Sequence, residues 1–177
     1  MNPFANRMLR AAKLESALYE EVEADRGAMG QALGVVVLAS LAAGIGALTT
    51  QGSAGILVGT LAALISWVVW AALTYVIGAK LLPEPQTEAD FPQLLRTIGF
   101  ASAPGLIRVA GIVPGLNPIV SLIAAIWMLV AMVIAVRQAL DYTSTWRAVG
   151  VCIIGFLVQV VILAALFALM DGLRPPA

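Results

Sequence analysis

One arginine inside an apolar stretch has the clearest capacity for chemistry in this sequence. Arg108 lies in the segment Leu94–Pro118, which a Pro-Gly pair interrupts at position 104 and a second Pro-Gly pair closes at position 114. Where an apolar stretch crosses a bilayer, hydrocarbon cannot solvate a guanidinium, so such a residue marks a candidate site. A broken helix at that depth also frees backbone groups that protein or cavity water must satisfy. We expect Arg108 either to meet an anion, a lipid phosphate or a carboxylate, or to lie near a helix end, where it extends to the interface or pairs structurally.

A second concentration of charge precedes the first long apolar run. Glu20, Glu21, Glu23 and Asp25 offer several carboxylate oxygens, which are the ligands that a divalent cation prefers. The alternative is that they are solvated or pair with basic residues on the same side, for which Arg96, Arg137 and Arg147 are available. The candidate contacts for a lipid, an ion or a protein partner are Arg108, Arg96, Pro104, Lys80, Glu21, Glu23, Arg137 and Asp141.

The residue inventory argues against an enzyme. The chain has no histidine, which removes the usual general base near neutral pH and the commonest metal ligand. Its one cysteine, Cys152, lies in an apolar run and allows no disulfide framework. We therefore predict no catalytic residue, no cofactor and no metal. The net charge of zero indicates no nucleic-acid partner.

The composition indicates the class of protein that contains these residues. Apolar residues make up 61% of the chain and charged residues 11%, and the mean hydropathy is +0.97. Soluble domains have roughly 45–50% apolar and about 25% charged residues. The surplus apolar surface must face lipid, so we predict an all-α integral membrane protein. Its spans are expected at approximately 29–49, 54–79, 94–113, 119–136 and 148–170, as a five-transmembrane-helix bundle with a Pro/Gly-broken third segment.

The chain is expected to form one membrane domain, residues 29–177, preceded by an N-terminal segment, residues 1–28. Apolar residues recur there at helical spacing, with charges on the opposite faces. This pattern predicts an amphipathic helix on the membrane surface or against the bundle, either as an anchor or as a docking helix. Small residues four apart, Gly30 with Gly34 and Gly55 with Gly59, allow close helix packing within one chain or between copies.

The topology follows from the distribution of Lys and Arg. The N-terminal segment has four, and the connections after the first and third spans have none, whereas Lys80 and Arg96, then Arg137 and Arg147, flank the other two connections. The alternation predicts a cytoplasmic N-terminus and a C-terminus outside. The alternative has four spans, with residues 94–118 re-entrant and both termini inside.

The order of several short motifs resembles a known family. They are FPQLLRTIGFASAP over 91–104, Ile112-Val113-Pro114-Gly115, Ile126-Trp127, and Ser144-Thr145-Trp146-Arg147-Ala148. Over roughly Val35–Leu169 the chain resembles the Yip (Ypt-interacting protein) domain in a bacterial form. The resemblance implies a five-span domain with a cytosolic N-terminus. Eukaryotic members are associated with Rab-type GTPases, sorting and membrane shaping, and with one another. The sequence lacks their long N-terminal region, so the GTPase role is not carried over.

Two functions are expected from these observations. The first is a non-enzymatic, membrane-organising or trafficking-like role in the cell (inner) membrane, through contacts with lipids, with unidentified proteins and with copies of itself. The alternative is a small ion or solute channel or transporter, with Arg108 and Arg96 near its pathway. A continuous polar path past Arg108 would distinguish the second from the first.

Overall fold

The computed structural model describes residues 2–48, 52 and 54–172, and every regular element within them is helical. The predicted all-α membrane class is confirmed at that level. Thr49, at the end of the first predicted span, and residues 173–177, on which the predicted C-terminal location falls, lie outside the described residues.

Within the described residues, four helices are long and apolar enough to cross a membrane. They are α3 (Met29–Gly46), α5 (Ala54–Thr74), α7 (Asn117–Ala139) and α8 (Thr145–Gly172). A π-helical turn, η2 (Tyr75–Leu81), extends α5, and a short 3₁₀ turn, η1 (Arg26–Ala28), precedes α3. Their outward side chains are apolar, and Leu57 for example is 68% exposed. An apolar outer surface of this extent suits lipid and not water.

The segment predicted as the third span consists of two elements. α6 (Phe91–Phe100) begins with a capping box, in which Asp90 accepts from the Gln93 backbone N–H and the Gln93 side chain accepts from the Asp90 N–H. After Ala101 and Ser102, the chain continues as a 3₁₀ helix, η3 (Ala103–Ile112). The change of helix type falls at the Ser-Ala-Pro sequence, because proline disfavours the α conformation for the residue before it.

The N-terminal segment differs from the single helix that the apolar spacing predicted. It forms α1 (Pro3–Ala12) and α2 (Ser16–Ala24), separated by a turn in which Leu14 has a φ of 63°. The turn lets both helices bury apolar residues against the bundle, among them Ala11, Leu18, Tyr19 and Val22. Both helices pack against the bundle, which is one of the two predicted locations.

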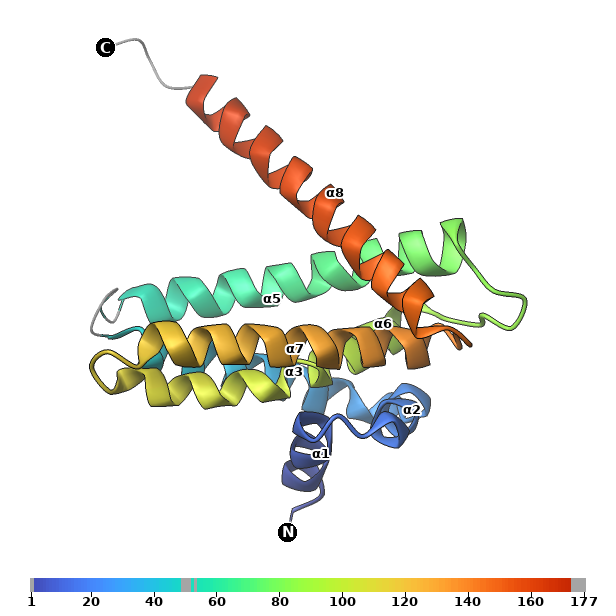
Figure 1. Cartoon of the computed structure of the whole chain (residues 1–177), viewed down its shortest axis with the longest axis horizontal. Coiled ribbons are helices and arrows are strands. Elements are labelled where there is room, and N and C mark those ends of the chain that lie inside the picture. The colour runs from blue at the N-terminus through green and yellow to red at the C-terminus, as the bar shows by residue number, and fades with distance from the viewer. Residues whose placement is uncertain (1, 49–51, 53, 173–177) are drawn as a thin grey trace.

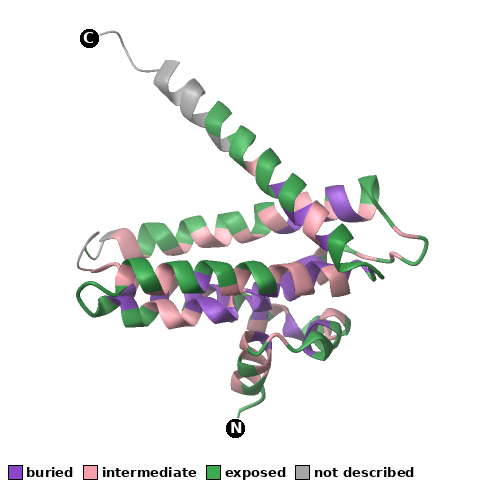
Figure 2. Ribbon diagram, in the orientation of Figure 1, coloured by how far each residue is buried: buried purple, intermediate pink, exposed green. Residues whose placement is uncertain are grey.

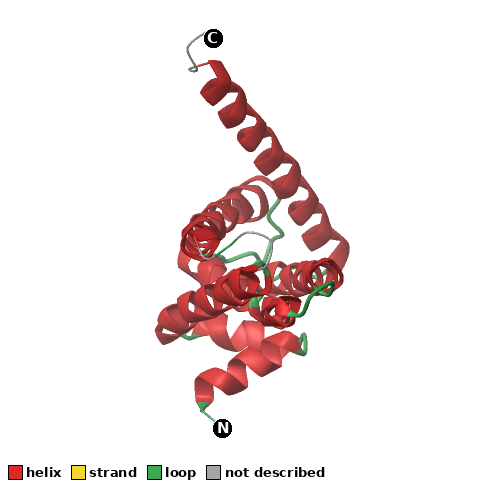
Figure 3. Cartoon of the chain, turned by 90° about the vertical axis from the view of Figure 1, so that its left-hand side faces the viewer, coloured by secondary structure: helices red, strands yellow, loops and turns green. Residues whose placement is uncertain are grey.

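The helices form a bundle with two distinct ends (Figure 1). α3, α5, α7 and the α6–η3 segment run alongside one another, and α1 and α2 lie across one flank, on α3, α6, α7 and η3. The turn 113–116 lies at one end of the bundle, and the connections 82–90 and 140–144 lie together at the other. α8 leaves the bundle at an angle from the second end (Figure 3).

The core lies where the irregular segment meets its neighbours. Buried residues concentrate between α1–α2, α3, α6 and α7, while α5 and α8 are mostly exposed (Figure 2). Many core residues are alanine, so the backbones approach closely, as is common in membrane bundles. Gly99 shows the principle, because an added Cβ would lie 2.8 Å from the Ala32 side chain. The core thus fixes η3 against α3 and α7.

Candidate functional site

Arg108 lies on η3 with its side chain half-buried between the long helices. Its Nε atom is buried and has no hydrogen-bond partner among the described residues. The backbone is held firmly here, because a Cβ at Gly46 of α3 would lie 2.0 Å from the Arg108 carbonyl oxygen. Asn117 of α7 also donates to the Gly46 carbonyl oxygen over 2.6 Å. A precisely placed backbone thus carries an unpaired guanidinium nitrogen.

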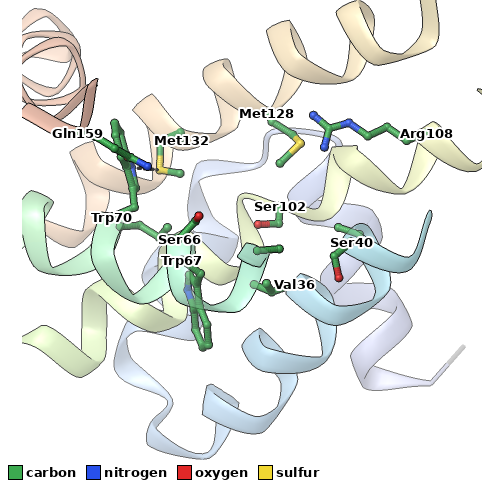
Figure 4. Close-up of a pocket in the computed structure, with 13 residues that line it drawn as sticks. Val36, Ser40, Ser66, Trp67, Trp70, Ser102, Arg108, Met128, Met132 and Gln159 are labelled. Atoms are coloured by element: carbon green, nitrogen blue, oxygen red, sulfur yellow. Dashed lines mark hydrogen bonds between the residues drawn. The ribbon is translucent and has the colours of Figure 1, made fainter. Parts of the chain in front are cut away.

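Two cavities meet at Arg108. One, of about 410 Å³, extends toward the end of the bundle where Ala47, Gly55 and Asn117 lie. The other, which we call the inner cavity, has a volume of about 270 Å³ and extends the opposite way, between Trp67, Trp70, Met128 and Met132 (Figure 4). Ser40, Ala63, Ser66 and Arg108 line both cavities.

The polar groups of these cavities are few. The hydroxyls of Ser66 and Ser102 bond to no described residue, whereas the Ser40 hydroxyl donates to the Val37 carbonyl oxygen over 2.8 Å. The indole N–H groups of Trp67 and Trp70 already donate to the Leu95 carbonyl oxygen and to the Met132 sulfur. These two side chains therefore contribute no free donor to the cavity wall. Gln159 adds an amide to the smaller cavity. A cation with neutral polar groups near it and apolar walls beyond can bind an anionic group.

Arg96, the other arginine of this segment, is placed very differently. It is buried, its Nε donates to the Val22 carbonyl oxygen over 2.9 Å, and its terminal nitrogen donates to the Glu23 carbonyl oxygen. These carbonyls belong to the last turn of α2, where helix geometry leaves acceptors without partners. Arg96 therefore joins α2 to α6 and lines neither cavity at Arg108.

Glu23, at the end of the bundle that holds Arg96, has a carboxyl group with a raised pKa. Burial raises the pKa of Glu23 to about 7, the negative charge of Asp141 adds to the shift, and Arg96 opposes it. Asp141 is exposed and has a φ of 52° in the connection between α7 and α8. The structure thus brings three of the sequence-predicted residues, Glu23, Arg96 and Asp141, into one electrostatic neighbourhood.

Glu21 and Asp25 pair with basic residues, as the alternative predicted, but their partners are Arg7 and Arg10 and not Arg96, Arg137 or Arg147. Glu21 accepts from Arg7 at 2.8 Å and from Arg10 at 2.5 Å, and Asp25 pairs with Arg7 at 2.9 Å. Hydrogen bonds from Arg10 and Arg7 lower the pKa of Glu21. The N-terminal turn brings α1 beside α2, and it therefore supplies nearer partners than the loops do. Over residues 2–48, 52 and 54–172, no three acidic or cysteine side chains group as metal ligands would.

The remaining predicted residues have local contacts. Arg137 donates to the carbonyl oxygens of Tyr142 and Thr143 and to the Thr145 hydroxyl, and so holds the connection into α8. Lys80 is exposed, with its ammonium 5.1 Å from the centre of the Tyr75 ring. Pro104 is fully buried and is not among the residues that line the cavities at Arg108.

Sequence reasoning missed most of the wall around Arg108. Ser66, Ser102 and Asn117 were not among the candidates, and the close approach of Gly46 to the Arg108 backbone was not predicted. The available signal was weak, namely single polar residues inside apolar runs. Such residues are as often used for helix packing as for a cavity wall.

Comparison with known proteins gives one match. The family model of the Yip1 domain matches residues 16–167. No curated protein matches the chain. No solved structure matches it either.

Proposed function

We propose that this chain, which belongs to the Yip1 domain family, is a non-enzymatic membrane protein that organises the bilayer around it through lipid and protein contacts. The observation that carries the proposal is the position of α1 and α2 across one flank of an otherwise lipid-facing bundle (Figure 1). We place α1 and α2 in the interfacial region of one leaflet, where they make the protein wider than it is in the other leaflet. Amphipathic helices at that depth respond to curvature and lipid composition. The proposed role includes contacts with copies of the same chain and with other membrane proteins.

Specific contacts support a rigid attachment of α1. The Trp127 indole N–H of α7 donates to the Ala12 carbonyl oxygen over 2.8 Å. The Phe4 ring lies against Gly34 of α3, where an added Cβ would be 3.3 Å from Phe4 Cζ. These contacts join α1 to two of the long helices, so the pair α1–α2 moves with the bundle.

The test is the shape of vesicles that contain the protein. Purified protein is reconstituted into vesicles of phosphatidylethanolamine and phosphatidylglycerol, and vesicle size is measured by electron cryomicroscopy. We expect the wild type to produce smaller or tubular vesicles, and Gly34→Leu to reduce the effect because leucine would displace Phe4. Gly150→Leu in α8 is the matched control, since a Cβ there meets nothing within 4 Å. Vesicles left unchanged by the wild type at every protein-to-lipid ratio would refute the role.

A five-span topology is part of the proposal, with α6 and η3 together as the additional span, the N-terminus in the cytoplasm and the C-terminus outside the cell (inner) membrane. Ten residues at 1.5 Å and ten at about 2.0 Å give roughly 35 Å, against about 30 Å of hydrocarbon. Contacts at both ends support a full crossing. Arg96 bonds to α2 at one end, and a Cβ at Gly111 would lie 2.9 Å from the Asn117 amide at the other.

Cysteine labelling tests this topology against the four-span alternative. In a Cys152→Ala background, Leu116→Cys and Glu88→Cys place single thiols at exposed positions of the two opposite turns. An impermeant maleimide added to intact cells should label the cysteine at 116 and reach the cysteine at 88 only after permeabilisation. A re-entrant segment would leave position 116 unlabelled from outside.

The alternative function, a small ion or solute conduit, is favoured by one observation, the meeting of two cavities at Arg108. The inner cavity, however, has largely apolar walls, formed by residues such as Trp67 and Met128. Ion and proton flux in proteoliposomes, compared with Arg108→Ala, tests it. Flux above empty vesicles that the substitution changes would favour the conduit, and its absence would favour the organising role.

A further inference from the structure

We propose that the two cavities at Arg108 form a binding site for an oxyanion that carries an acyl chain, either a lipid phosphate or a fatty-acid carboxylate. The inference rests on the proposed lipid-contacting function, and it names the site and the ligand chemistry. The oxyanion lies at Arg108, and the chain continues along the apolar walls beyond it.

Charge balance is the first argument. The sequence has no Asp or Glu in residues 29–81, 103–140 or 142–170, so α3, α5 and α7 provide no counter-ion. Over the described residues, the ion-paired arginines are Arg7, Arg10 and Arg147, and Arg108 is not one of them. A charge removed from water without a partner is costly, because little solvent remains to stabilise it. An anion that enters from the bilayer would supply the missing partner.

The donors at the junction suit an oxyanion. The guanidinium is a planar fork that matches the geometry of a carboxylate or phosphate, and its buried Nε is unpaired. The hydroxyls of Ser66 and Ser102 bond to no described residue, and Ser66 belongs to both cavities. Gly59 and Ser66 of α5 are exposed, so the junction is reachable from the protein surface.

The rest of the cavity wall suits hydrocarbon and not a hydrated ion. Beyond Arg108 and the serines, the inner cavity is bounded mainly by apolar and aromatic side chains such as Val36, Trp67 and Met128, and the Gln159 amide is its further polar group (Figure 4). Trp70 also lines a third cavity of about 650 Å³ between α7 and α8, whose wall is almost entirely apolar. The inner cavity and this third cavity therefore share one side chain. A free inorganic anion would lose its hydration there without replacement, whereas an acyl chain would lose only contact with other lipid chains.

The test is ligand binding by purified, delipidated protein in a neutral detergent, followed by thermal stability and native mass spectrometry. The probes are dioleoylphosphatidylglycerol, oleate, uncharged methyl oleate and inorganic phosphate. We expect the phospholipid, the oleate or both to bind, and methyl oleate and inorganic phosphate to bind at least tenfold more weakly. Binding of the phospholipid alone assigns a phosphate, and binding of oleate alone assigns a carboxylate.

Variants locate the binding. Arg108→Gln should weaken binding at least tenfold, whereas Arg26→Gln, which removes an exposed arginine outside the cavities, should leave it unchanged. Ser66→Leu keeps Arg108 but fills the junction from an exposed position, so it should also weaken binding and does not depend on how Arg108→Gln folds. The proposal is overturned if Arg108→Gln and Ser66→Leu bind like the wild type, if methyl oleate binds as well as the tighter of the two acyl-chain anions, or if neither of those anions binds. Because the assay uses detergent, its failure is distinct from a failure of the vesicle-shape test.

Discussion

Arg96 and Arg108 belong to the same irregular segment, yet the protein satisfies one and leaves the other open. Arg96 is 5% exposed and donates to two carbonyl oxygens at the end of α2. Arg108 is less deeply buried, and its Nε has no described partner. The comparison teaches that a buried arginine is structural where a helix end supplies acceptors, and is available to a ligand where the described residues around it leave its Nε without an acceptor.

The largest difference is expected when each arginine is replaced by methionine. Arg96→Met would leave two backbone carbonyls at the end of α2 without donors, which should cost about 2–4 kcal/mol of unfolding free energy. Arg108→Met should change that free energy by less than about 1 kcal/mol, or raise it, because an uncompensated charge is removed. Unfolding of both variants in detergent measures the difference. Equal losses would show that Arg108 is structural too, and the comparison would fail.

The position of Arg108 can be tested through its backbone. At Gly46 an added Cβ would lie 2.0 Å from the Arg108 carbonyl oxygen, so Gly46→Ala should displace η3 and cost about 1–3 kcal/mol. Gly30→Ala in the same helix is the control, since its Cβ meets nothing within 4 Å. It should be neutral or gain up to about 1 kcal/mol from helix propensity. Thermal unfolding compares the two, and similar behaviour would contradict the tight packing of η3 on α3.

The end that holds Arg96 should respond to pH through Glu23. Because burial raises the pKa of Glu23 to about 7, from the model-compound value of 4.5, the folded chain binds more protons than the unfolded chain between these values. Stability should therefore fall as pH rises from about 5 to 8. The lowered pKa of Glu21 places its titration below that window.

Glu23→Gln imitates the neutral carboxyl, so it should flatten this dependence and be more stable than the wild type at pH 8 by about 1–2 kcal/mol. Glu88→Gln, an exposed carboxyl in the connection before α6, should retain the wild-type profile. Thermal midpoints at several pH values check both. A Glu23→Gln profile parallel to that of the wild type would contradict the buried, partly neutral carboxyl.

The smallest effect on the folded chain is expected at Gly30, which faces open space near the end that holds Arg96. If a second copy covers this face, light scattering should give a dimer mass for the wild type, and Gly30→Leu should weaken the dimer at least tenfold. The unfolding free energy of the single chain should change by no more than about 1 kcal/mol, which is the gain in helix propensity. A monomeric wild type, or a dimer that Gly30→Leu leaves intact, would exclude self-association through this face.

The sequence predicted the long helices well and the irregular parts less well. The spans around α5 and α7 followed from uninterrupted apolar runs, because only length and composition decide them. The division of the N-terminal segment at Leu14 was missed, since a left-handed turn at a leucine has no local signature. The motif order identified the family, although each motif is short and apolar.

By itself the sequence determined that the chain is helical and lipid-facing, because composition and periodicity act locally and need no partner. The order of its motifs indicated the Yip1 domain family. It also placed one charge, Arg108, in a stretch, residues 103–140, that contains no acidic residue. Only the tertiary structure decided what each arginine meets. The Val22 carbonyl that Arg96 bonds, and Ser66, which lines the same cavities as Arg108, come from segments distant in sequence. Long-range packing of backbones on alanine and glycine brings them together, and single-residue patterns do not encode it.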